Sequence, residues 1–241
     1  MAEQEIIKHM EAIVKASQNK KKKLQSRLQE ILLEIAIIVF AVSISIWFHN
    51  WAETLKDRKD ARVFLAGLRR DLVADIEEMN SDRQTLNKVI TGTHYFERVG
   101  RGEPLNNDSL LVYQTTFLTW VQIDPRISRF EALKGSGRLG IIEDDSLLLH
   151  ITDLYTKDFS LVTLRNNYYM SLRQQMLTPY LVQHLELDTA GRGTNWQQLL
   201  RTSAMRIQML QGESLRNNIE AYDKAIAKCE LIVKEIDEEL H

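Results

Sequence analysis

The feature that most constrains this chain is an apolar stretch at residues 31–48, which reads ILLEIAIIVFAVSISIWF and contains a single charged residue. At roughly 1.5 Å per residue, a helix of this stretch is about 27 Å long, close to the thickness of the hydrocarbon core of a bilayer. Trp47 and Trp51 stand at its end, and tryptophan is enriched at membrane interfaces. The sequence therefore predicts one transmembrane helix at residues 31–51.

A buried core helix and a cleaved signal peptide are the two competing explanations of this stretch. A signal peptide begins within a few residues of the start and ends in a small-residue cleavage site. Here the apolar residues begin only at Ile31, and the bulky residues Ile46, Trp47 and Phe48 close the stretch. An uncleaved membrane anchor is the better interpretation.

The cationic residues on either side of the span predict its orientation, because loops rich in lysine and arginine are retained on the cytoplasmic side. The N-terminal flank carries Lys15, Lys20, Lys21, Lys22, Lys23 and Arg27, and the C-terminal flank carries Lys56, Arg58, Lys59 and Arg62. This bias predicts a basic cytoplasmic segment at residues 1–30 and an extracytoplasmic domain at residues 52–241. In a Gram-negative cell the anchor would lie in the inner membrane and the domain in the periplasm.

Glu34 is a carboxylate inside the predicted span, where ionisable residues are costly and often functional. At roughly 100° per residue, Glu34, Ala41, Ser45 and His49 fall on one stripe of the helix. This stripe is a candidate intramembrane association surface, and Glu34 is also a candidate proton carrier. Its position near the start of the span equally allows Glu34 to stay hydrated or to pair with the lysines.

The remainder of the chain has helical periodicity, and its few prolines and glycines, 3 and 10 in 241 residues, favour long uninterrupted helices. A first helix is expected over residues 65–90. One of the residues from Asn106 to Ser109 is expected to cap a second helix that includes Phe117 and Trp120. Asp124 and Pro125 are expected to begin a third helix.

Two further helix caps and one proline are predicted to shape the helices that follow. Asp144 or Asp145 is expected to cap a helix that Pro179 would kink, and Asn195 to cap a helix that starts at Trp196. The predicted fold class is all-α: one N-terminal transmembrane helix followed by an extramembrane helical bundle with long antiparallel helices.

The last helix has the clearest pattern in the sequence, because its apolar residues alternate spacings of four and three over more than three heptads. This candidate packing seam consists of Leu215, Ile219, Tyr222, Ile226, Cys229, Val233, Ile236 and Leu240. Such a helix packs in a bundle or a coiled coil. Cys229 lies on the seam and is interpreted as a small buried apolar residue, not as a reactive thiol.

Residues that support catalysis or cofactor binding are not found. The stretch GSGRLG, with Gly135, Gly137 and Gly140, has the glycine spacing of a dinucleotide-binding loop, but a helix precedes it where a strand is required. A helix end followed by a turn explains it better. The six histidines are scattered without the one-turn spacing of a helical metal site. We therefore expect a non-enzymatic protein without cofactors or metals.

The charge distribution constrains the partners. The formal net charge is −2, so nucleic acid is not an expected partner. The expected partners are membrane lipid and either a second copy of the chain or another membrane protein.

Two stretches together resemble a known family. They are LLEIAIIVFAVSISIWFHNWAE with the following DRKDARVFLAGLRRDL, and RFEALKGSGRLGIIEDDSLLLHITDLY. They resemble a family of single-span membrane proteins that is widespread in Bacteroidota and has no assigned activity. The positions that carry the resemblance are Glu34, Trp51, Leu68, Asp71, Leu72, Leu133, Gly137, Ile142 and Leu147. Ala41 stands where the family pattern has glycine. The resemblance implies the same architecture and adds no mechanism.

The leading hypothesis is a non-enzymatic, membrane-anchored bundle that mediates protein association in the cell envelope, with oligomerisation through the C-terminal helix. One alternative is a ligand-sensing bundle in which a small molecule between helices acts on a partner. A further alternative is a proton-coupled accessory subunit that uses Glu34.

Overall fold

The computed structural model describes the backbone of residues 2–116, 119–212 and 214–240, and the side chains of these residues from Leu32 onward, except Thr116. The chain divides into two units, residues 1–59 and 60–241, and helix α1 (Ala2–Gly100) belongs to both. The side chains of the basic segment at residues 1–30, and Phe117, lie outside the described residues.

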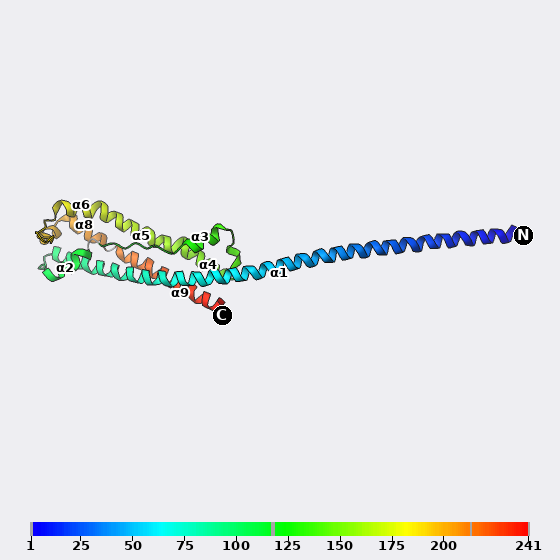
Figure 1. The fold of residues 1–241 in the computed structure, drawn as a ribbon. Helices are drawn as coiled ribbons and strands as arrows, with labels where there is room; N and C mark the ends of the chain where they lie inside the picture. Colours follow the sequence, from blue (N-terminus) through cyan, green and yellow to red (C-terminus); the bar gives the residue numbers. More distant parts are fainter. Residues whose placement is uncertain (1, 117–118, 213, 241) are drawn as a thin grey trace. The chain divides into compact units, whose positions relative to one another are not determined.

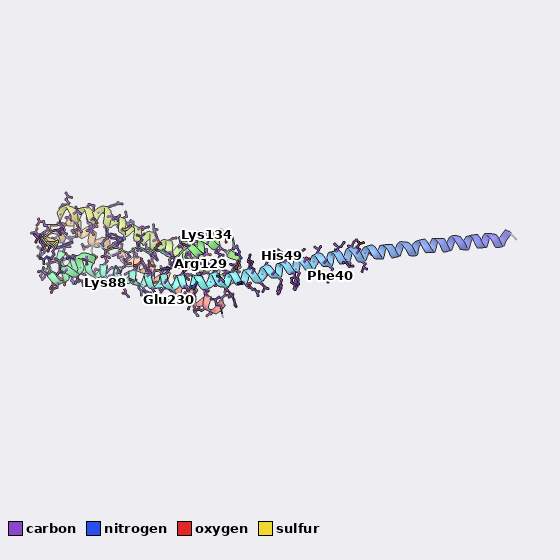
Figure 2. The ribbon with its side chains drawn as sticks, in the orientation of Figure 1. Phe40, His49, Lys88, Arg129, Lys134 and Glu230 are labelled. Atoms are coloured by element: carbon purple, nitrogen blue, oxygen red, sulfur yellow. The ribbon has the colours of Figure 1, made fainter. Side chains whose placement is uncertain are left out.

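In the first unit, α1 presents the apolar segment as a helix whose described side chains are exposed. Within the helix from Leu32, the most apolar window of 18 residues has none of its residues buried. Phe40 and His49 lie on this helix with exposed side chains (Figure 2). By length and composition, this helix is long and apolar enough to cross a membrane.

The second unit is a helical bundle, and the all-α prediction is confirmed for the part of the chain that the structure describes (Figure 1). A bridge between Leu187 and Gly193 is its sole strand-like pairing in the described residues. Besides α1, its elements are α2 (Asn107–Thr116), α3 (Ser128–Gly135), η1 (Leu139–Ile141), α4 (Asp145–Asp153), η2 (Leu154–Asp158), α5 (Phe159–Leu172), η3 (Arg173–Leu177), α6 (Thr178–His184), α7 (Trp196–Leu200), α8 (Ser203–Gly212) and α9 (Leu215–Leu240).

Helix α9 runs antiparallel to the other long helices of the bundle. On α1, Arg69 pairs with Asp237 at 2.6 Å, and Arg83, further along, pairs with Asp223 at 2.6 Å. The order of the partners on α9 is thus reversed. The same reversal relates α9 to the run from α4 to α5, where His150 contacts Glu235 and Asn166 contacts Asn218.

Helix α1 and the run from α4 to α6 lie parallel to each other, and α9 is antiparallel to both (Figure 1). Tyr222 on α9 bonds both Asp82 of α1 and Asn166 of α5, so these two residues lie at the same level of the bundle. Further along, Thr93 of α1 lies across a cavity from Arg173, so the residue numbers of the two helices rise in the same direction. The parallel arrangement arises because residues 101–144 return along the bundle before α4 begins.

Two predicted helix caps are confirmed. Asn106 Oδ1 accepts from Ser109 N at 2.8 Å, and Asp144 Oδ1 accepts from Ser146 N at 2.7 Å. The predicted cap at Asn195 is wrong, because its side chain bonds backward: Oδ1 accepts from Glu186 N and Nδ2 donates to His184 O.

The predicted helix start at Asp124 is wrong, because α3 begins at Ser128. The backbone N–H of Arg126 donates to the Asp75 carboxylate on α1, so this segment is held outside a helix. Trp120 also lies outside the helix predicted for it, because α2 ends at Thr116.

The helical run over residues 145–184 contains two π-helical turns, η2 and η3. Pro179 lies in the first turn of α6, directly after η3. Proline lacks the backbone N–H that an α-helix interior requires, and the wider turn accommodates it without ending the run.

The segment that returns along the bundle is fastened to α1 by arginines. Arg126 bonds Asp75 and Glu78, Arg129 bonds Asp71 at 2.9 Å, and Arg138 bonds Asp60 at 2.9 Å. These ion pairs fix the register of the segment on α1. Most of them are half-exposed, and they therefore contribute little stability. Asp75 is the exception because it is only 1% exposed.

We predict that Arg126→Gln lowers the free energy of unfolding at pH 7 by about 2–3 kcal/mol, less than for a fully buried pair because Arg126 is half-exposed. Burial raises the pKa of the Asp75 carboxyl, and the hydrogen bonds from Arg126 oppose that rise. Their loss raises the pKa further. The destabilisation is therefore present above this pKa and is lost as the pH falls through it, because Asp75 becomes neutral.

Urea unfolding at several pH values measures this effect. The double variant Asp75→Asn with Arg126→Gln is the control, and it should unfold with little pH dependence at this site. A loss of stability in Arg126→Gln that is equal at acidic and neutral pH would contradict the prediction.

Candidate functional site

The candidate packing seam faces the interior of its own bundle. Leu215, Tyr222, Ile226, Cys229 and Ile236 are buried. The remaining members, Ile219, Val233 and Leu240, are partly buried and pack against the same core. The partners of the seam are apolar residues of α1 and of the run from α4 to α5. This face of α9 is therefore covered within one chain, and a second copy cannot use it while the bundle is closed.

Cys229 is buried as predicted, and burial raises the pKa of its thiol. A thiol with a raised pKa is protonated at neutral pH and is a poor nucleophile. This side chain serves as a small member of the core.

The candidate intramembrane stripe lies on α1 in the first unit. Glu34, Ala41, Ser45 and His49 are all exposed on this helix. Ser45 Oγ donates to the Ala41 carbonyl oxygen at 2.8 Å, a bond within the helix. The four residues share one helix, as the spacing requires, and association or proton transfer through them stays a prediction.

The core of the bundle consists of two hydrophobic clusters. On α1 the boundary between them falls between Val89 and Tyr95, and on the following long run it falls between Tyr169 and Leu177. On the last helices the boundary coincides with the break between α8 and α9.

A network of buried polar side chains lies inside the first cluster, on the side toward this boundary. Tyr222 donates its hydroxyl to Asp82 Oδ2 at 2.9 Å and accepts from Asn166 Nδ2 at 2.7 Å. Asn218 Nδ2 donates to Asn166 Oδ1 at 3.2 Å. Burial is the main cause that raises the pKa of the Asp82 carboxyl, although the Tyr222 hydrogen bond opposes it. This network joins α1, α5 and α9.

Arg173 lies at the boundary itself, between Tyr169 of the first cluster and Leu177 of the second. Its guanidinium lies 4.8 Å from the centre of the Tyr169 ring, and Nη1 donates to the Thr119 carbonyl oxygen at 3.0 Å. Burial lowers the pKa of Arg173 and raises that of Tyr169 to about 12. Both groups keep their usual charge states at neutral pH.

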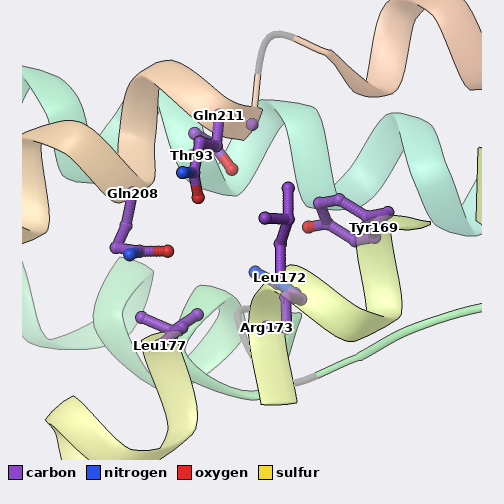
Figure 3. A pocket seen from close by; sticks show the side chains of 8 residues that line it. Thr93, Tyr169, Leu172, Arg173, Leu177, Gln208 and Gln211 are labelled. Atoms are coloured by element: carbon purple, nitrogen blue, oxygen red, sulfur yellow. The ribbon is translucent and has the colours of Figure 1, made fainter. Parts of the chain in front are cut away.

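Figure 3 shows a small cavity at this boundary, where side chains from α1, α5, η3 and α8 converge. Its volume is about 10 Å³, close to the space that one water molecule requires. Thr93, Gln208 and Gln211 offer it polar groups. The cavity suits a structural water and is too small for a metabolite.

A larger cavity lies at the end of the bundle where α2, α6 and the segment before α7 meet. Its volume is about 520 Å³, within the usual range of small-molecule sites. The sequence analysis did not predict it, because residues on separate elements form its walls. No periodic signal marks such a site.

One face of α5 is apolar and exposed. Leu161, Leu164 and Tyr168 recur at spacings of three and four and point away from the core, which instead receives Val162 and Tyr169. Leu164 is 66% exposed. The sequence alone did not predict this exposed face, because two apolar faces on one helix share the same residue types.

The glycine-containing loop is a helix end and a turn, as the sequence analysis preferred. Helix α3 ends at Gly135, and Gly137 has a φ of 70°, which glycine adopts readily. Lys134 contacts Glu131, and Arg138 contacts Asp60. The first contact lies within α3, and the second fastens the loop to α1.

The residues that carry the family resemblance in the bundle have structural roles. Leu68, Leu72, Ile142 and Leu147 are buried in the first cluster, and Asp71 pairs with Arg129. They maintain the fold and do not assemble a site.

In the described residues, no group of three or more histidine, cysteine, aspartate or glutamate side chains is arranged to hold a metal ion. Comparison with family models, with curated proteins and with solved structures gives no match for this chain.

Proposed function

We propose that the protein is a non-enzymatic, membrane-anchored helical bundle that associates with other proteins in the cell envelope. The observation that carries the proposal is the exposed apolar face of α5, because exposed apolar side chains that lie side by side are typical of interaction surfaces. Because the seam of α9 is buried in its own bundle, we place the association surface on α5 and not on the C-terminal helix.

The proposed location is the inner membrane, with residues 1–30 in the cytoplasm and residues 52–241 in the periplasm. The exposed apolar segment of α1 supports the anchor, since contact with lipid would cover side chains such as Phe40 and Trp47. The excess of lysines before the span supports the orientation. Membrane lipid is thus the first proposed partner.

The proposed protein partner is a second copy of the chain. An anchor restricts all copies to one membrane, and the α5 face is separated from the anchor by the same length of chain in every copy. Two such faces can therefore meet at the same level in a two-fold arrangement, in which each patch contacts itself. Leu161, Leu164 and Tyr168 supply the aromatic and aliphatic contacts typical of the centre of an interface.

Two alternatives remain proposals. The large cavity favours a ligand-sensing bundle that acts on a partner. Glu34 within the apolar helix is the sole support for a proton-coupled accessory subunit. Another membrane protein could take the place of the second copy on the α5 face.

For the anchor, we predict that the full-length protein stays in the membrane fraction after an alkaline carbonate wash. The double variant Ile38→Arg with Val42→Arg should be released from the membrane by this wash, because each arginine near the centre of a span costs about 2.5–3.5 kcal/mol of insertion free energy. The control variant carries arginine at Leu149 and Leu210 instead, two exposed apolar residues of the bundle, and should stay membrane-bound. Carbonate extraction of the parent protein would overturn the anchor.

For the association, we predict that Leu164→Asp raises the dissociation constant of the homo-oligomer about thirtyfold or more, which corresponds to about 2 kcal/mol. Light scattering of the protein in mild detergent measures it. The matched control is Leu210→Asp on α8, where the side chain is 67% exposed against 66% for Leu164. A parent protein that is monomeric, or an oligomer that both variants leave intact, would contradict the proposal.

A further inference from the structure

The large cavity at the end of the bundle has walls from several elements. Gln114 and Thr115 of α2 form one side, and Thr178, Leu181 and Val182 of α6 form another. Leu185 and Leu187 follow from the chain after α6, and Trp196 of α7 completes the walls.

Hydrogen bonds fix the turn that shapes this cavity. Thr194 N donates to the Glu186 carbonyl oxygen at 2.8 Å, and Asn195 bonds the backbone of both His184 and Glu186. Within the turn, Asp188 Oδ1 accepts from the backbone N–H groups of Ala190 and Arg192. The wall is therefore held in place without a ligand.

Glycine and tryptophan complete the wall. A Cβ atom at Gly193 would overlap the Trp196 ring, so only glycine allows the turn to lie against the indole. On the other side, Trp196 stacks on Phe96, with ring centres 5.5 Å apart. The indole is thus packed from two sides and keeps a defined position beside the cavity.

The chemistry of the lining is apolar and uncharged. Its larger side chains are leucine, valine and tryptophan, and its polar groups are the Gln114 amide and the hydroxyls of Thr115 and Thr178. No aspartate, glutamate, lysine, arginine or histidine is among the described residues that line it. An ionised ligand would lose hydration here without gaining an opposite charge.

We propose that this cavity binds an uncharged, largely apolar small molecule. Its volume of about 520 Å³ accommodates a molecule of metabolite size, and the amide and hydroxyls allow a few neutral hydrogen bonds. The site is distinct from the α5 face and does not depend on the proposed association.

Photolabelling tests the site in the full-length protein in lipid nanodiscs. The probe is an octanol that carries a photoreactive diazirine, and peptide mass spectrometry locates its adducts. We expect saturable adducts on residues 178–196 that unlabelled octanol competes away. Octanoate, with the same chain and a negative charge, should compete about tenfold or more weakly, which corresponds to about 1.4 kcal/mol.

Variants on two walls locate the binding site. Val182→Arg and Leu187→Arg each place a large cation at the cavity and should lower labelling of residues 178–196 about tenfold or more. Leu149→Arg on α4 is the matched control, because Leu149 is 58% exposed and Leu187 is 60% exposed. It should label like the parent protein.

Three results would overturn the proposal. They are adducts that do not saturate, labelling that both wall variants leave unchanged, and equal competition by octanoate and octanol. None of these results depends on the oligomeric state, so a failed association and a failed ligand site remain distinguishable.

Discussion

The burial of the α9 seam is the interaction on which the rest of the bundle depends. Its buried residues contact α1 on one side and the run from α4 to α5 on the other, so that α9 joins two helices that run parallel. Parallel helices require a long connection, and residues 101–144 provide it. The arginines of that connection then bond carboxylates of α1 that the seam does not use. These ion pairs fix the register of the connection on α1.

Buried polar side chains also determine how the helices of the bundle are arranged. Tyr222 belongs to the seam, and its hydroxyl bonds Asp82 and Asn166 within the first hydrophobic cluster. Buried polar groups with satisfied hydrogen bonds specify one arrangement of helices, because a shift by one turn would leave donors and acceptors without partners. The break between α8 and α9 and the π-helical turn η3 lie at the boundary between the two hydrophobic clusters. The second cluster, with the large cavity at its end, is a separate packing unit, and the buried polar residues Thr93 and Arg173 lie between the two clusters.

The sequence predicted the elements whose signals are local. Helical periodicity located α1 and α9. The caps at Asn106 and Asp144 were predicted to within a few neighbouring residues, because their hydrogen bonds reach only two or three residues along the chain. Prediction failed where distant partners decide the structure. Asp124 and Pro125 resemble a helix start, but Asp75 on another helix captures the Arg126 N–H. The α9 seam was recognised as a packing surface, whereas its partner in the same chain was not, since a heptad pattern does not state which helix it meets. The candidate sites show the same limit, because the α5 face and the cavity become visible only when the core residues are known.

Spin-label distances between Arg83→Cys on α1 and Asp223→Cys on α9, in a Cys229→Ala background, test most directly whether the seam closes within one chain. The two side chains form an ion pair at 2.6 Å, so the labels should give a short distance. The doubly labelled protein is refolded together with an excess of unlabelled chain. A short distance with unchanged signal amplitude after this dilution is the predicted result. Loss of the short distance on dilution would mean that α9 packs on another copy, and it would contradict the account.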